Sequence, residues 1–172
     1  ISNTLYHQGI MRYVQRTWHN TEVNMGVYTT INDPSAYFQS TLFTGTGTTH
    51  NIVNTGNSNL KPDWLWSKKR SATQNHCLVD SSRGVTGEIY SNLNDAEYTS
   101  FNGVASFNTD GFTAQNANGG TNTNGATYVA WQWKANGGTT SSNSDGSITS
   151  SLQANTTAGF SIVTYTGTGS NA

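Results

Sequence analysis

Two pairs of tryptophans, each with one residue between them, are the side chains in this sequence best placed to bind a ligand. Trp64 and Trp66 form the first pair, and Trp131 and Trp133 form the second. Residues two apart in a β-strand share a face, so each pair would place two indoles side by side. Exposed indoles stack on sugar rings, whereas buried ones fill the space between sheets, each burying about 150–250 Å². Apolar neighbours favour the core for most of the four, and the candidates for a glycan site or a subunit interface are Trp18, Trp64 and Trp66.

The acidic side chains do not form a recognisable catalytic pair. Glycosidases need two carboxylates about 5–9.5 Å apart, and Asp33, Asp63, Asp110 and Asp145 stand in turns, where Asp binds its own backbone. Asp95 and Glu97 could share a strand face, but they suit a solvated loop equally well. Asp80 and Arg83 are expected to form a structural ion pair that fixes a turn. We therefore assign no catalytic residue.

Nucleophiles and metal ligands are equally sparse. The sequence has neither a G-x-S-x-G nor a Walker A motif, and its four histidines are isolated. The single cysteine, Cys77, excludes an internal disulfide and a multi-cysteine zinc site, and its apolar run predicts a buried, unpaired thiol. No EF-hand-type calcium loop is found. We expect no enzyme activity, no metal and no cofactor.

The elements that would carry these residues are short strands separated by turns. Thr and aromatic residues favour strands, Gly, Asn and Ser favour turns, and no helical periodicity is found. An Asp-Gly turn is expected between Phe107 and Phe112, and loops at 119–125 and 136–146. Many short strands at intervals of about 8–12 residues predict an all-β, antiparallel β-sandwich, jelly-roll or concanavalin-like, with an N-terminal extension. Strands are expected at 37–44, 50–54, 64–68, 76–80, 88–91, 98–101, 128–134, 148–152 and 160–166.

The composition narrows the classes of partner. Thr, Asn, Ser and Gly make up about half of the 172 residues, whereas charged residues are only 10% and the net charge is −1. A nucleic-acid-binding protein should be basic, so we expect no nucleic-acid partner. No apolar run reaches the length that a membrane-spanning helix needs, so we expect no membrane insertion.

Residues 38–47 and 160–169 resemble each other at a constant offset of 122 residues. Both begin with Phe and end in Thr-Gly-Thr-Gly. We divide the chain accordingly into a docking segment at 1–35 and a sandwich module at 36–157. Residues 158–172 are either the opening strand of a second module or the closing strand of the first. A true repeat also predicts that the native chain continues beyond Ala172.

Five strings in the chain resemble a repeat module of uncharacterised function in tail-fibre-like and other virion proteins of marine bacteriophages. They are LKPDWLWSKKRS (60–71), HCLVDSSRG (76–84), FNTDGF (107–112), YVAWQWKA (128–135) and GFSIVTYTG (159–167). The resemblance covers residues 36–172 and carries over no catalytic residue.

The resemblance implies a structural protein on the surface of an extracellular phage particle. A tail fibre, attached through residues 1–35, is preferred over a capsid decoration protein. The expected partners are other virion proteins and further copies of the chain, with a trimer favoured by analogy with phage fibres. The alternative is a carbohydrate-binding module for glycans on the host surface.

Overall fold

The computed structural model describes residues 30–116 and 118–169, and apart from one 3-10 turn the regular elements of this part of the chain are all β-strands. Its elements are the 3-10 turn η1 (Pro34–Ala36) and the strands β1 (Phe38–Thr44), β2 (His50–Ile52), β3 (Trp64–Lys69), β4 (Cys77–Asp80), β5 (Gly84–Tyr90), β6 (Val104–Phe107), β7 (Phe112–Ala114), β8 (Thr127–Trp133), β9 (Ser141–Asn143), β10 (Ser150–Asn155) and β11 (Phe160–Tyr165). The predicted all-β class is confirmed.

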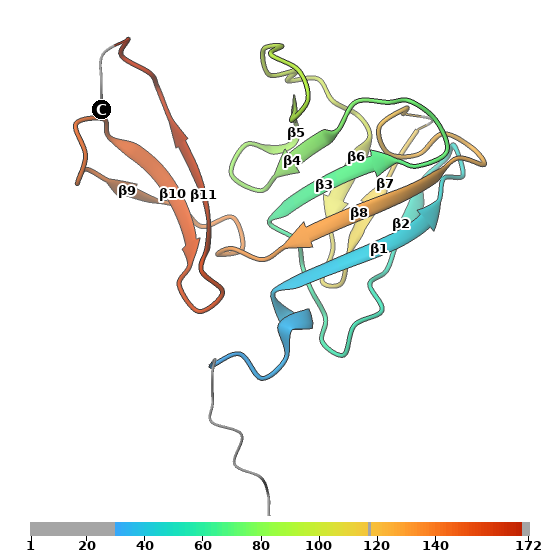
Figure 1. The fold of residues 1–172 in the computed structure, drawn as a ribbon, viewed down its shortest axis with the longest axis horizontal. Coiled ribbons are helices and arrows are strands. Elements are labelled where there is room, and N and C mark those ends of the chain that lie inside the picture. Colours follow the sequence, from blue (N-terminus) through green and yellow to red (C-terminus); the bar gives the residue numbers. More distant parts are fainter. Residues whose placement is uncertain (1–29, 117, 170–172) are drawn as a thin grey trace, which may run out of the picture.

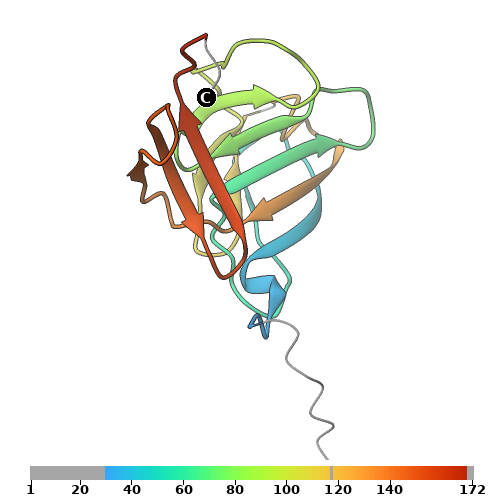
Figure 2. The same cartoon turned by 60° about the vertical axis from the view of Figure 1, so that its left-hand side comes forward.

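The strands form three antiparallel sheets (Figure 1). Sheet A has the order β1-β8-β3-β4-β5, sheet B the order β2-β7-β6, and sheet C the order β11-β10-β9. Sheets A and B pack face to face, which confirms the β-sandwich. Sheet C lies beside one end of sheet A, next to the end of β8 (Figures 1 and 2).

The hydrophobic core lies between sheets A and B because alternate residues of their strands point into this space. Leu65 of β3 and Ala130 of β8 enter it from sheet A, and Phe112 of β7 enters it from sheet B; all three are fully buried. Cys77 also belongs to this cluster and has no disulfide partner. The predicted buried, unpaired thiol is therefore confirmed.

Polar side chains in the same space are satisfied by one another. Gln132 Nε2 donates to Asn54 Oδ1 at 2.6 Å, and the Thr41 hydroxyl donates to the same oxygen at 2.8 Å. All three residues are buried, so the bonds offset the cost of removing these groups from water. The network ties the loop after β2 to strands β1 and β8.

The Asp-Gly turn between two aromatic residues joins β6 to β7 as expected. The Asn108 amide donates to the Gly111 carbonyl at 2.9 Å, and Asp110 Oδ1 accepts from the Leu60 amide at 3.1 Å. Gly111 has a φ of +86°, and a Cβ on it would collide with the Ile52 carbonyl. Only glycine fits there, for both reasons.

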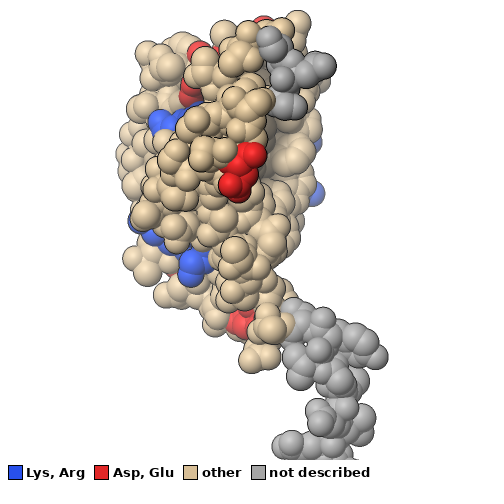
Figure 3. Space-filling model, turned by 90° about the vertical axis from the view of Figure 1, so that its left-hand side faces the viewer, with Lys and Arg blue, Asp and Glu red and all other residues tan. Residues whose placement is uncertain are grey.

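Sheet C is attached to the sandwich by side chains. Buried Gln153 of β10 donates to the Ser81 and Ser82 hydroxyls at 2.8 and 2.7 Å, in the turn between β4 and β5. Its Oε1 accepts from the backbone amides of Asn136 and Gly138 at 3.2 and 3.0 Å, in the loop after β8. The outward side of the molecule that sheet C occupies carries few charged side chains (Figure 3).

Two expectations about elements are wrong. Residues 98–101 do not form a strand, and Tyr98 makes only an isolated bridge with Glu88. Conversely, the expected loop at 136–146 contains β9. The residue types of β9 do not predict a strand, because a Ser/Thr/Asn sequence becomes a strand only through its pairing with β10.

The turn at Asn32 to Ser35 is present, with Asp33 capping η1 through bonds to the Ser35 amide at 2.9 Å and hydroxyl at 2.6 Å. Hydrogen bonds from Ser35 and Ser58 lower the pKa of the Asp33 carboxyl. The rest of the proposed docking segment, including Trp18, lies outside the described residues.

Candidate functional site

The two tryptophan pairs lie side by side on adjacent strands of sheet A. Trp64 of β3 is directly opposite Trp133 of β8, and Trp66 is opposite Trp131. Phe38 of β1 continues the first row, opposite Trp133 on its other side. We call these five residues the aromatic face.

The aromatic face points away from the core, so the expectation that most of the tryptophans fill the space between the sandwich sheets is wrong. All four indoles are half-buried, and the positions between them are the buried ones. Those inward positions include two polar residues, Ser67 and Gln132. Ser67 is accommodated because its hydroxyl donates to the buried Gly120 carbonyl at 2.9 Å.

The two ends of the aromatic face differ. Trp133 lies against Phe38, with ring centroids 4.8 Å apart, and stacks on Phe160 of sheet C at 6.0 Å. Trp66 and Trp131 meet edge to face at 5.5 Å, with planes 64° apart. The face is therefore two aromatic clusters, one in contact with sheet C, rather than one flat platform.

Trp66 is held in place by a histidine that sequence reasoning did not connect with it. Its Nε1–H donates to His76 Nδ1 at 3.2 Å, and the two rings lie 5.8 Å apart. His76 immediately precedes β4, which pairs with β3. This bond requires the His76 Nδ1 atom to be an acceptor.

Asp80 and Arg83 form the ion pair expected from the sequence. Arg83 Nε lies 2.6 Å from Asp80 Oδ2, and Asp80 Oδ1 accepts from the Ser82 and Arg83 amides, both at 2.9 Å. Arg83 Nη1 also reaches Glu97 Oε1 at 2.9 Å. Asp80 is almost fully buried, so the pair fixes the turn from β4 to β5.

The other buried carboxylates are also engaged in structural contacts. Asp63 Oδ2 accepts from the Ala135 and Gly137 amides at 2.7 and 3.0 Å, and its Oδ1 accepts from the Ser81 hydroxyl at 2.7 Å. Glu88 accepts from the Tyr90 hydroxyl at 3.0 Å. Neither carboxylate lines the pocket described below.

Cys77 lies beside Glu88, and this environment makes its thiol unreactive. Burial raises the pKa of the Cys77 thiol well above its usual value, and the neighbouring Glu88 carboxylate raises it further. Burial and the hydrogen bond to Glu88 likewise raise the pKa of Tyr90 to about 12. Because the thiolate is the nucleophile, a thiol held protonated cannot initiate covalent chemistry at neutral pH.

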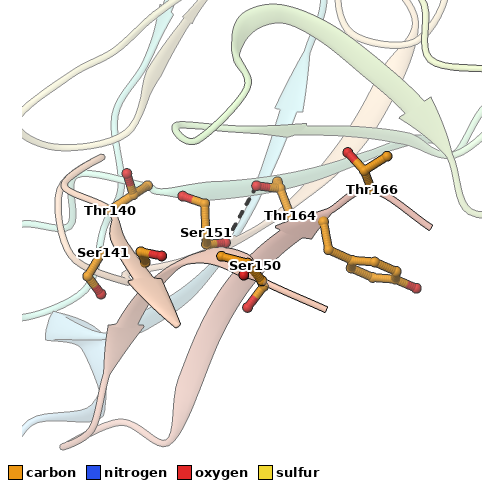
Figure 4. A pocket seen from close by; sticks show the side chains of 9 residues that line it. Thr140, Ser141, Ser150, Ser151, Thr164 and Thr166 are labelled. Atoms are coloured by element: carbon orange, nitrogen blue, oxygen red, sulfur yellow. Dashed lines mark hydrogen bonds between the residues drawn. The ribbon is translucent and has the colours of Figure 1, made fainter. Parts of the chain in front are cut away.

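A second candidate site is a pocket of about 470 Å³ on sheet C (Figure 4). Nine residues line it, and every one carries a hydroxyl: four threonines, four serines and Tyr165. In Figure 4 the side chains of Thr140, Ser151, Thr164 and Thr166 point to one side of the sheet. Sequence reasoning missed this pocket, although the density of Ser and Thr between 139 and 151 was a signal for it.

Two kinds of feature are absent from the part of the chain that the structure describes. No group of three or more His, Cys, Asp or Glu side chains is placed to hold a metal ion within residues 30–116 and 118–169. The same residues include no helix with the length and apolar character needed to cross a membrane.

Comparison with known proteins gives one match. No curated protein and no solved structure matches the chain. A family model described as "Domain of unknown function (DUF7483)" matches residues 33–172, which include every strand of the three sheets. The chain therefore belongs to this family.

Proposed function

We propose that the protein is a structural component of a bacteriophage virion surface, with a tail fibre as the favoured location and no catalytic role. The observation that carries the proposal is the position of the exposed apolar side chains. Leu42 on edge strand β1 is 64% exposed, and Val163 and Tyr165 on edge strand β11 are 50% and 68% exposed. Apolar side chains exposed along unpaired sheet edges favour contact with further protein subunits.

The low charge of the chain supports the same proposal. With 10% charged residues and a net charge of −1, copies of the chain repel one another weakly and can remain in fixed contact. The five sequence strings that resemble phage virion modules supply the particle context. Residues 1–35 would attach the chain to other virion proteins, and the copies would form a homo-oligomer, with a trimer expected.

Immunogold labelling of purified phage particles with antibodies against residues 36–157 tests the location. Label along the tail fibres supports the proposal in full. Label distributed over the head would replace the fibre by a capsid decoration protein. Particles that carry no label, while the same antibody detects the protein in the infected cell, would refute the virion role.

The oligomeric state is tested with the full chain by light scattering after size-exclusion chromatography. We expect a trimer, and we expect Leu42→Ser to weaken it because this change places a hydroxyl on the exposed apolar edge. Val53→Ser is the matched control, because Val53 is 51% exposed but follows the short strand β2. A monomer at all concentrations, or equal effects of both changes, would contradict the expected interface.

Glycan binding is a second candidate, favoured by the outward orientation of Trp66 and Trp131. Half-exposed indoles can stack on the apolar face of a sugar. Trp131→Ala should abolish retention of the protein on immobilised host glycans, whereas Phe107→Ala, in sheet B, should leave retention unchanged. Retention that survives Trp131→Ala would exclude the aromatic face as the glycan site.

A further inference from the structure

The pocket on sheet C is lined by hydroxyl-bearing side chains alone. Tyr165 is its only residue with a titratable side chain. Ser142 of β9 is directly opposite Ser151 of β10, which is directly opposite Thr164 of β11. One row of three hydroxyl side chains therefore crosses all three strands, with neighbours about 5 Å apart.

Most of this hydrogen-bonding capacity is unused. The Thr164 hydroxyl donates to the Ser151 carbonyl at 3.5 Å. The other eight lining hydroxyls make no side-chain hydrogen bond to any described residue. Each of these groups can donate one hydrogen bond and accept two. The pocket thus offers hydroxyl groups that can each donate and accept a hydrogen bond. The strands that carry them are already ordered by the backbone hydrogen bonds of sheet C.

The inner end of the pocket is fixed by the contacts that hold sheet C in place. On the face of sheet C that carries the hydroxyl row, Gln153 is the next residue after Ser151 along β10, and Ile162 is the residue before Thr164 along β11. Both are buried. Gln153 makes four hydrogen bonds to the sandwich. The hydroxyl row therefore lies next to an anchored part of sheet C, and this anchoring lowers the entropic cost of binding a ligand.

We propose that this pocket binds a neutral saccharide of one or two rings. A sugar presents several hydroxyls that both donate and accept, which matches the lining. The volume of about 470 Å³ lies within the range of small-molecule sites. A phosphate or carboxylate would find no cation in the lining, a metal ion no carboxylate, and an apolar ligand would leave the hydroxyls unpaired.

This inference stands apart from the virion location, because it concerns what the chain binds wherever it resides. The pocket is open, and the aromatic residue in its lining, Tyr165, is on the other face of β11 from Thr164, so a single site should bind with a dissociation constant of about 1–10 mM. Several copies in one oligomer would convert this weak binding into strong attachment to a glycan-covered surface.

The test uses the full chain labelled with ¹⁵N and titrated with the methyl glycosides of mannose, galactose and N-acetylglucosamine. At least one glycoside should produce saturable shifts in the amide signals of Ser142, Ser151 and Thr164. The indole N–H signals of Trp66 and Trp131 should not move. Methanol at the same concentration controls for a solvent effect and should give no saturable shift.

A pair of double variants identifies the site. Ser142→Ala with Ser151→Ala removes two neighbouring hydroxyls that make no internal bond, and should weaken binding at least about fivefold. Ser144→Ala with Ser161→Ala makes the same chemical change outside the pocket lining, and should leave the affinity unchanged. Dispersed amide spectra for both variants would establish that they fold.

Three results would overturn the proposal. The first is the absence of saturable shifts with all three glycosides. The second is a set of shifts confined to the tryptophan indoles, which would assign sugar binding to the aromatic face. The third is an equal loss of affinity in both double variants, which would mean that the hydroxyl row does not provide the contacts.

Discussion

The ring of Phe160 stacks on the indole of Trp133, with centroids 6.0 Å apart and planes 18° from parallel. This contact joins β11 of sheet C to β8 of sheet A. Phe38, which is equivalent to Phe160 at the 122-residue offset, contacts the same indole from β1. Both matching strands therefore contribute their leading phenylalanine to one tryptophan.

Phe160→Ala should loosen sheet C without unfolding the sandwich. Loss of a half-buried ring should cost about 1–3 kcal/mol of unfolding free energy. Hydrogen exchange should become faster for β9, β10 and β11 amides and stay slow for β3 and β8. Val163→Ala, on the exposed face of the same strand, serves as the control. Faster exchange throughout sheet A would contradict this assignment.

Asp63→Ala should be strongly destabilising, because Asp63 is buried and its carboxylate binds three donors. It leaves the Ala135 and Gly137 amides and the Ser81 hydroxyl without their acceptor, which should cost about 2–4 kcal/mol in urea unfolding. Asp145→Ala removes an exposed carboxylate that accepts from Asn143, and should cost less than about 0.5 kcal/mol. Similar urea midpoints for the Asp63→Ala and Asp145→Ala variants would show that the Asp63 contacts do not order the loop after β8.

Arg83→Ala and Glu97→Ala separate a buried ion pair from an exposed one. Removing Arg83 leaves the buried Asp80 carboxylate with only its two amide donors, and should cost about 3–5 kcal/mol. Glu97 is 38% exposed at its side chain, so its loss should cost less than about 1 kcal/mol. Equal losses of unfolding free energy in the two variants would mean that the contact with Asp80 is not the dominant contact of Arg83.

Because the pKa of the Cys77 thiol is raised in the folded protein, we expect the protein to lose stability in alkaline solution. The native protein keeps its proton above the pH at which the unfolded thiol ionises, because burial raises its pKa. The unfolded state then binds fewer protons, so the unfolding free energy falls as the pH rises above about 8.5, by at most about 1.4 kcal/mol per pH unit. Cys77→Ala should remove this slope between pH 8.5 and 10.

The same thiol should resist labelling while the chain is folded. A thiol reagent at pH 8 should modify Cys77 slowly in buffer and rapidly in urea. Tyr90, whose pKa is raised to about 12, should extend the alkaline loss of stability above pH 10. A flat unfolding free energy from pH 8 to 10 would show that the thiol ionises equally in both states.

Strands that carry their own signal were predictable from the sequence. The segment 128–134 alternates and contains Val, Tyr and Trp, and it corresponds to β8 within one residue at each end. The Asp-Gly turn was equally local, because only glycine adopts the positive φ at Gly111. β9 was not predictable, because its Ser-Ser-Asn sequence is ordered by β10 rather than by its own propensity.

The orientation of the tryptophans was not predictable from the sequence for a different reason. Both faces of β3 and β8 carry large or polar residues, and the period of two does not say which face is inward. Buried partners far away in the chain decide it: Gln132 bonds Asn54, and Ser67 bonds Gly120. The hydroxyl pocket was not predictable for a similar reason. Its row of hydroxyl side chains comes from three strands, and the sequence does not reveal their register.

The separate attachment of sheet C has a mechanical consequence. A pull on the C-terminal end of β11 is resisted at the sandwich by the Phe160 stack and the Gln153 hydrogen bonds, which break one after another. The long ladder between β1 and β8 must instead break many hydrogen bonds together when its strands slide. Under tension sheet C should therefore detach first and lengthen the molecule, while the sandwich keeps its fold.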